Sequence, residues 1–142
     1  MRVFFGHPKT WDDDLINEAV VELTADMKAG LEQDIVVVSG RDDFQLNIAS
    51  EGNFNGWCRS IARRTDQYGK RWYDVIAIPK APEGIGKATA MIAQDALRVG
   101  LPVVQVEWLA EGGIGVESVV AVDEEDTENY FAGWRLVTRP IT

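Results

Sequence analysis

Four short apolar runs alternate in this chain with stretches whose apolar residues recur at helical spacing. The runs are continuous and rich in β-branched residues, which is typical of strands covered by helices on both faces. They cover residues 2–5, 35–38, 73–78 and 101–106. The helical stretches cover residues 15–31, 57–67 and 85–99. This order predicts an α/β fold with a mainly parallel sheet and right-handed crossover connections.

The C-terminal part of the chain is less regular. Residues 119–122 and 134–137 indicate two more strands, and the acidic segment 123–130 between them favours a solvated loop or a helical turn. We expect about five strands, with a possible extra C-terminal strand, in one domain spanning the whole chain. Its core and its irregular extension cover residues 1–107 and 108–142. The extension could carry a contact between copies, so a homo-oligomer is expected.

Charge and composition limit the classes of partner that the protein can bind. The formal net charge is −9, from 23 acidic and 14 basic residues, which opposes an extended nucleic-acid surface because such surfaces are basic. A small anionic ligand is compatible with this net charge, since a helix N-terminus can bind phosphate. Cys58 and His7 are the single cysteine and histidine, so we expect no disulfide, metal site or cofactor. No apolar run approaches ~20 residues, and the first apolar stretch is too short for a signal peptide, which predicts a cytoplasmic protein without a membrane partner.

Residues that follow the expected strands are candidates for a site, because ligands of parallel sheets bind outside the carboxyl ends of the strands. We expect ligand contacts from Gly6, His7, Gly40, Arg41, Asp43, Gly84, Gly86, Lys87 and Thr89. The polar stretch 39–55 is expected to be a loop, functional or disordered. Aromatic residues near these loops could stack on a base or belong to the core, namely Trp11, Phe44, Phe54 and Trp57.

The segment 82–89 is the most informative of these loops. Gly84 and Gly86 allow the backbone to approach a ligand closely, and the helix that follows offers free N–H donors to a phosphate or carboxylate. Lys87 adds a positive charge, and Thr89 is placed to bond the ligand or cap the helix. The alternative is a glycine-rich turn that needs only positive φ.

Three residues are candidates for catalysis, namely Glu83, His7 and Asp42. The position of Glu83 suits a nucleophile or general acid, although an exposed side chain is the simpler reading. His7 could act as an acid or base near neutral pH, or be a partly buried polar residue. The segment 41–43 could bind a phosphate with its guanidinium and sugar hydroxyls with its carboxylates, or form a solvated turn.

The sequence also predicts the positions of several polar residues in the helices. Thr10 is the predicted N-cap of the first helix. Asp95 is expected at the surface, and Arg59, Arg63 and Arg64 are expected on a solvated helix face.

Three segments resemble the nucleoside 2-deoxyribosyltransferase-like group and the related SLOG proteins, which include the lysine decarboxylase-like nucleotide hydrolases. They are residues 4–8 (FFGHP), 74–91 with its VIAI strand and GIGKATAM turn, and 96–104 (ALRVGLPVV). The resemblance covers about residues 1–107. It implies a Rossmann-like three-layer fold and a ligand containing a nucleoside, nucleotide or ribose. For the enzymes of these groups it also implies cleavage of an N-glycosidic bond.

The chain departs from both family patterns at one place. Those patterns place a glutamate in the helix after the glycine turn, whereas residues 87–92 hold no acid. An oxocarbenium-like transition state needs a nearby carboxylate, which Glu83, Asp42, Asp43 or Glu107 would have to supply. The leading hypothesis is therefore a non-catalytic binder of a nucleotide- or nucleoside-like molecule. The alternatives are an N-glycosidic hydrolase or deoxyribosyltransferase, and a structural or interaction protein.

Overall fold

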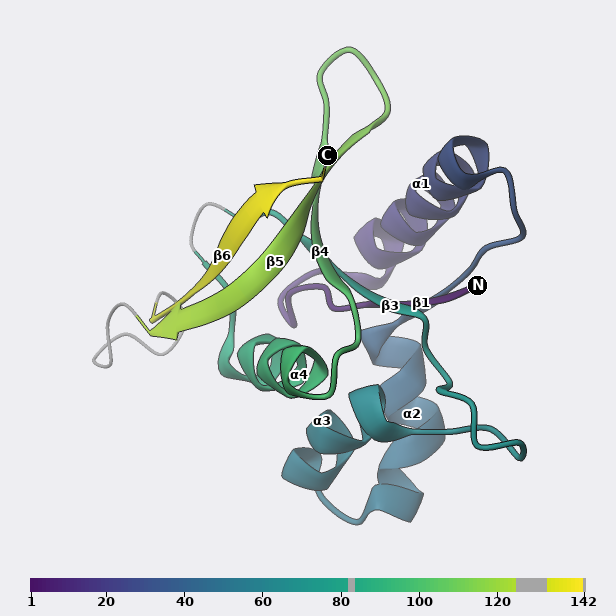
Figure 1. Ribbon diagram of the computed structural model, residues 1–142, viewed down its shortest axis with the longest axis vertical. Helices are drawn as coiled ribbons and strands as arrows, with labels where there is room; N and C mark the ends of the chain where they lie inside the picture. The colour runs from purple at the N-terminus through teal and green to yellow at the C-terminus, as the bar shows by residue number, and fades with distance from the viewer. Residues whose placement is uncertain (82–83, 125–132, 142) are drawn as a thin grey trace.

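The computed structural model describes residues 1–81, 84–124 and 133–141, and Figure 1 shows its ribbon. In chain order the elements are β1 (Arg2–Phe5), α1 (Asp13–Leu31), β2 (Val36–Ser39), α2 (Gly40–Glu51), α3 (Phe54–Arg63), β3 (Val75–Pro79), α4 (Lys87–Arg98), β4 (Val103–Trp108), β5 (Ile114–Glu124) and β6 (Trp134–Pro140). This confirms the predicted α/β class. None of the helices in this part of the chain is both long and apolar enough to cross a membrane.

The strands form one sheet in the order β2-β1-β3-β4-β5-β6. The four strands predicted from the continuous runs pair in parallel, which confirms the mainly parallel sheet. Strands β5 and β6 extend it as an antiparallel pair. The C-terminal part is thus more regular than predicted, and its two strands are longer than expected. The strand order turns back at β1, because β2 lies on one side of it and β3 and β4 on the other.

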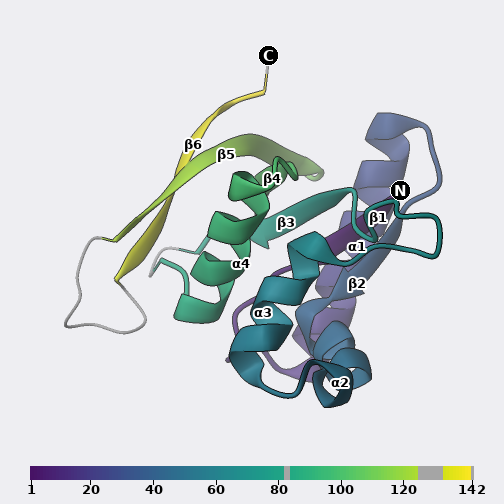
Figure 2. The same ribbon diagram turned by 60° about the horizontal axis from the view of Figure 1, so that its bottom comes forward.

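Alternating side chains of the central strands point into two separate apolar clusters. Val3 and Phe5 of β1 pack with Ala19 and Leu23 of α1. Phe4, between them, packs on the other side with side chains of α3 and α4. Figure 2 shows α1 and the pair α3 and α4 on opposite sides of β1 and β3. Burial on both faces explains why these strands read as continuous apolar runs.

Helix α2 corrects the prediction of a loop over residues 39–55. Its N-cap is Ser39, whose side chain accepts a hydrogen bond from the amide of Asp42, and its C-cap is Gly52 at φ 79°. The polar composition concealed the helix, because its apolar stripe is short and most of its side chains are exposed or half-buried. The two capping residues were the signal that could have revealed it. Helix α3 follows after Asn53, earlier than predicted.

Two other helix starts differ from the prediction. The N-cap of α1 is Asp12, which accepts a hydrogen bond from the amide of Leu15 over 2.8 Å, and not Thr10. Helix α4 begins at Lys87 and not at residue 85, because the amide of Ile85 donates to the carbonyl of Trp134 in β6. The capping bond of Asp12 fixes the start of α1, and the bond of Ile85 to β6 fixes the start of α4.

Asp95 is buried, with 5% of its surface exposed, which corrects its predicted position at the surface. Arg63 reaches it from α3 with two hydrogen bonds of 2.7 and 3.0 Å. The arginines of α3 therefore do not form one solvated face. Arg63 joins α3 to α4, and Arg64 turns inward to a second carboxylate.

Candidate functional site

The loops that follow β1, β2 and β3 meet at the carboxyl edge of the sheet. A Cβ atom added at Gly6 would lie 3.7 Å from Cγ2 of Thr89, in the first turn of α4. A Cβ atom added at Gly40, at the start of α2, would lie 3.8 Å from Nε2 of His7. These four predicted site residues therefore come together, as expected for the ends of parallel strands.

Both ring nitrogens of His7 have partners. Nδ1 lies 3.0 Å from the carbonyl oxygen of Pro8, and Nε2 accepts the backbone N–H of Arg41 over 3.2 Å. This pair of bonds selects the neutral tautomer with the proton on Nδ1. The ring also stacks on Trp11, with 6.4 Å between centroids and 16° between planes. Burial lowers the pKa of His7, and the charge of Arg41 lowers it further, against the opposite effects of the Pro8 carbonyl and Asp42.

The side chain of Arg41 is committed to carboxylates and an amide of its own chain. Its guanidinium donates to Asp13 over 2.9 Å, to Asn17 over 2.8 Å and to Asp42 over 3.1 Å. The hydrogen bond with Asp42 and then that with Asp13 raise the pKa of Arg41. These contacts fasten the start of α2 to the first turns of α1. The predicted phosphate contact would have to compete with them.

Asp43 faces the protein interior, with 1% of its surface exposed. Its carboxylate accepts hydrogen bonds from Arg64 over 2.7 and 3.1 Å, from the indole of Trp57 over 2.8 Å and from the hydroxyl of Tyr73. Burial alone would raise the pKa of Asp43, but the hydrogen bonds of Arg64, Tyr73 and Trp57 outweigh it and hold the pKa below its usual value. Asp43 thus ties α2 to α3 and to the entry of β3, and its oxygens are occupied within the chain.

The start of α4 differs from the start of α2 in its free donors. Gly84 has a φ of 87°, so glycine suits this turn, and Gly86 is an N-cap without a side-chain hydrogen bond. Among the described residues, no acceptor bonds the amides of residues 87–89. A Cβ atom added at Gly86 would meet no atom within 4 Å, so the backbone here is open. In α2, by contrast, the amides of Arg41 and Asp42 are already bonded.

Lys87 stands beside these free amides. Its side chain is exposed and makes no ion pair with a described residue. Glu83, the predicted acid of this turn, lies outside the described residues. At the ends of the neighbouring strands β3 and β4, Lys80 and Glu107 form an ion pair of 3.5 Å. The cation of this edge that has no carboxylate partner in the described part of the chain is therefore Lys87 and not Arg41 or Lys80.

Strand β6 contributes to the edge in a way that the sequence did not indicate. The amide of Ile85 donates to the carbonyl of Trp134 over 3.2 Å, so β6 holds the turn that starts α4. Sequence reasoning placed this strand in an extension because the two partners lie far apart in the chain. No local pattern carries such a contact.

Aromatic residues divide between the edge and the core. Trp57 is buried, and Phe44 packs against it edge-on with 5.2 Å between centroids, so both belong to the interior of the α2 and α3 pair. Phe54 joins the same group with 47% of its surface exposed. Trp11 lies at the carboxyl edge against His7. Of the four predicted stacking residues, Trp11 is the one beside the other edge residues.

Two hollows of the surface lie away from the carboxyl edge. One of about 340 Å³ is lined by Lys28 and residues 32–34 at the end of α1. Another of about 270 Å³ lies between the end of α4 and the strands β4 and β5. Neither is at the carboxyl edge, and the described residues hold no cluster of His, Cys, Asp or Glu arranged for a metal ion.

Comparison with known proteins does not place the chain in a family. No protein-family model matches it, and no curated protein or solved structure shows significant similarity to it. The resemblance of the GIGKATAM turn to deoxyribosyltransferase-like and SLOG proteins therefore stays a hypothesis. Functional inference rests on the geometry of the carboxyl edge.

Proposed function

We propose that this protein binds a nucleotide- or nucleoside-like small molecule at the carboxyl ends of β1 and β3, as a cytoplasmic sensor or sequestering protein. The fold would then be a divergent Rossmann-like three-layer fold. One observation carries the proposal: α4 begins beside Gly6 with amides that bond no acceptor among the described residues, where the strand order turns back between β1 and β3.

A phosphate or other anionic group suits the start of α4 for a physical reason. The amides of a helix's first turn and the helix dipole attract negative charge, and the twelve-residue helix α4 presents both, with no acceptor for these amides among the described residues. Lys87 adds a positive charge without a competing carboxylate among the described residues. Open sheets bind ligands at such a reversal of strand order. The rest of the ligand would extend over Gly6 toward His7 and Trp11.

Binding without turnover is the preferred form of the proposal because the described carboxylates of this edge are engaged. Asp42 holds the guanidinium of Arg41, and Asp43 is buried in hydrogen bonds. His7 would have to give up its bond with the Arg41 amide before it could take a proton. N-glycosidic cleavage would therefore depend on Glu83 or Glu107 as the acid group.

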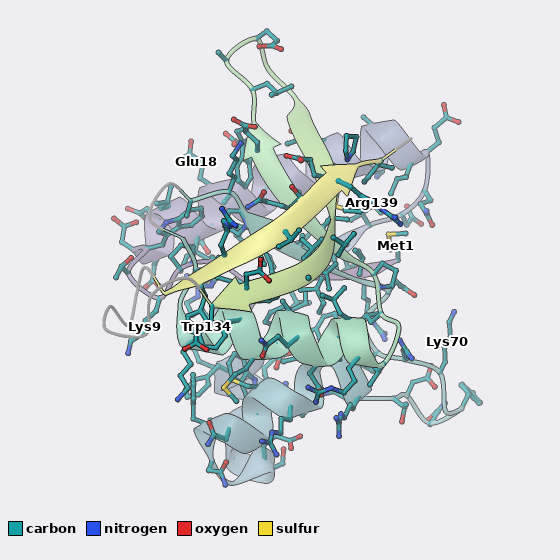
Figure 3. All side chains as sticks on the ribbon, turned by 60° about the vertical axis from the view of Figure 1, so that its left-hand side comes forward. Met1, Lys9, Glu18, Lys70, Trp134 and Arg139 are labelled. Carbon is teal, nitrogen blue, oxygen red and sulfur yellow. The ribbon has the colours of Figure 1, made fainter. Side chains whose placement is uncertain are left out.

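Thermal shift with a panel of nucleosides, nucleotides, ADP-ribose species and cyclic nucleotides tests binding. A true ligand at 100 times its Kd should stabilise the folded protein by about 2.7 kcal/mol. Lys87→Ala should weaken that ligand about tenfold, which corresponds to about 1.4 kcal/mol. Lys70→Ala, in a turn on another part of the molecule (Figure 3), is the matched control and should bind normally.

The outcomes separate the hypotheses. Absence of any shift in folded protein would remove the proposal, and equal weakening by Lys87→Ala and Lys70→Ala would move the site away from α4. Chromatography of the panel after incubation with the protein tests for turnover. Turnover that disappears in Glu83→Gln would establish the enzymatic alternative in place of simple binding.

A further inference from the structure

On the side of the sheet where α1 packs, no helix of the described residues covers strands β5 and β6. Val104 and Val106 of β4 point to that side, with Val106 in the cluster beneath α1. Since Val104 pairs with Ser118 and Val106 with Val116, these β5 residues face the same way. The pairing of Ser118 with Arg139 continues this face onto β6.

The helix that contacts β5 and β6 lies on the opposite side. Val119 and Leu136 belong to the cluster of α3 and α4. Helix α1 contacts β2, and its buried residues share the other cluster with side chains of β1, β3 and β4. Figure 3 shows β6 crossing the front of the molecule with no helix in front of it. Within the described residues, the α1 side of β5 and β6 is therefore covered by no helix. Its side chains Val116, Ala121 and Val137 remain half-buried.

Helix α1 carries a complementary surface on the same side of the sheet. Ile16, Ala19 and Leu23 form its buried stripe. The opposite stripe bears Val21, which is 68% exposed, and the exposed side chains of Glu18 and Glu22 lie to one side of it around the helix. This stripe of α1 offers one apolar side chain and two carboxylates to a neighbouring surface.

The half-face of β5 and β6 and the outward surface of α1 carry charges of opposite sign. The half-face of β5 and β6 ends at Arg139, an exposed cation that forms no ion pair with a carboxylate of the described residues. The outward surface of α1 bears exposed carboxylates, and the strand surface ends in an exposed cation.

We propose that this half-face is the interface of a two-fold dimer, in which α1 of each copy packs on β5 and β6 of the other. Because both surfaces lie on the same side of one chain, a two-fold axis brings each surface onto its counterpart at once. Val21 then covers the half-buried valines, and Arg139 meets the row of Glu18 and Glu22. The interface is independent of the ligand site at the carboxyl edge.

Sedimentation equilibrium and light scattering measure the assembly directly. The unaltered protein should be a dimer whose dissociation constant is weakened about tenfold or more by Arg139→Glu and by Glu18→Arg, since each change places like charges in contact. The double variant carrying both changes should regain dimerisation, because the pair is restored with its signs exchanged. Lys70→Glu, outside the interface, is the matched control of charge.

Each result bears on the interface. A monomer at the highest soluble concentration overturns the proposal, as does a dimer that Arg139→Glu and Val21→Glu leave unchanged. Failure of the double variant to recover overturns the pairing of Arg139 with Glu18. Circular dichroism of each variant verifies folding, and Val21→Glu provides a second disruption on an exposed site if Arg139→Glu is unfolded.

Discussion

The backbone N–H of Arg41 donates a hydrogen bond to Nε2 of His7 over 3.2 Å. This bond joins the loop after β1 to the first turn of α2, although the residues are 34 positions apart. It exists only while Nε2 is unprotonated, because the imidazolium ion has no acceptor nitrogen. The single histidine of the chain therefore links the geometry of the carboxyl edge to pH.

Stability should fall as the pH drops below about 6.5, the ordinary pKa of histidine. The pKa of His7 in the folded protein is lowered, mainly by burial, so the unfolded chain binds the proton first. The stability that neutral His7 contributes is fully present above the pKa that His7 has in the unfolded chain. It is lost as the pH falls from that value to the lower pKa that His7 has in the folded protein. One proton limits the slope to about 1.4 kcal/mol per pH unit. Urea unfolding between pH 5 and about 8 measures it.

His7→Gln supplies the comparison for this titration. Its side chain can still accept from the Arg41 amide but has no proton to gain in this range. The difference in unfolding free energy between the two proteins should change with pH only below about 6.5. A constant difference over the whole range would contradict the proposed role of His7 protonation.

Asp43→Asn should cost about 3–5 kcal/mol of stability, because it leaves Arg64 as a buried cation without its counterion. The guanidinium has only 17% of its side-chain surface exposed, and it donates to Asp43 over 2.7 Å. Asn keeps the shape and one acceptor oxygen, but it removes the charge and places an NH2 donor where the second oxygen accepted hydrogen bonds. Chemical unfolding gives the difference.

Asp13→Asn is the matched control, since it also removes a carboxylate from an arginine pair. The Asp13 side chain is 80% exposed, so its pair with Arg41 should contribute less than about 1 kcal/mol. Similar costs for the two substitutions would show that burial is not what makes the Asp43 pair important.

Asp12→Ala should destabilise the protein by about 1 kcal/mol through loss of the N-cap of α1. The carboxylate accepts from the amide of Leu15, and the same amide would lose its partner in the variant. Thr10→Ala, two residues earlier, should stay within about 0.5 kcal/mol of the unaltered protein. A larger effect at Thr10 would mean that the helix is capped there in solution.

Cys58 should react slowly with thiol reagents as long as the protein is folded. Its side chain is fully buried, and burial raises the pKa of the thiol to about 11. At pH 8 the lower thiolate fraction alone should slow the reaction by at least about 100-fold relative to free cysteine. Labelling followed by mass spectrometry, with denatured protein as the reference, measures the rate. Rapid labelling of folded protein would show that α3 opens locally.

Local patterns predicted some elements better than others. The strands containing residues 36–38 and 75–78 were found because burial on both faces makes a strand apolar at every position. Helix α2 was missed because its inward contacts include the carboxylate of Asp43, which a hydrophobic pattern counts as exposed. The partner that makes this burial tolerable, Arg64, lies in the next helix.

The predicted site residues fall into two groups that have the same position relative to a strand but different hydrogen bonding in the structure. Gly40, Arg41 and Asp43 follow β2 in the same way as Gly84, Gly86 and Lys87 follow β3. In the folded chain the first group bonds to its own neighbours, whereas the second keeps free amides and a free cation among the described residues. Spacing identifies the carboxyl edge but does not say which of its donors are already used.

The sequence by itself determined the α/β class, the four parallel strands and the edge at which their loops gather, because burial of each short segment leaves a local pattern of apolar residues. Tertiary structure alone decided that Arg41 binds carboxylates, that Asp43 faces inward and that β6 holds the turn before α4. Those contacts join residues 21 to 49 positions apart, since Ile85 pairs with Trp134 and Asp43 with Arg64. Partners at such separations are chosen by the packing of whole elements, which no local pattern records.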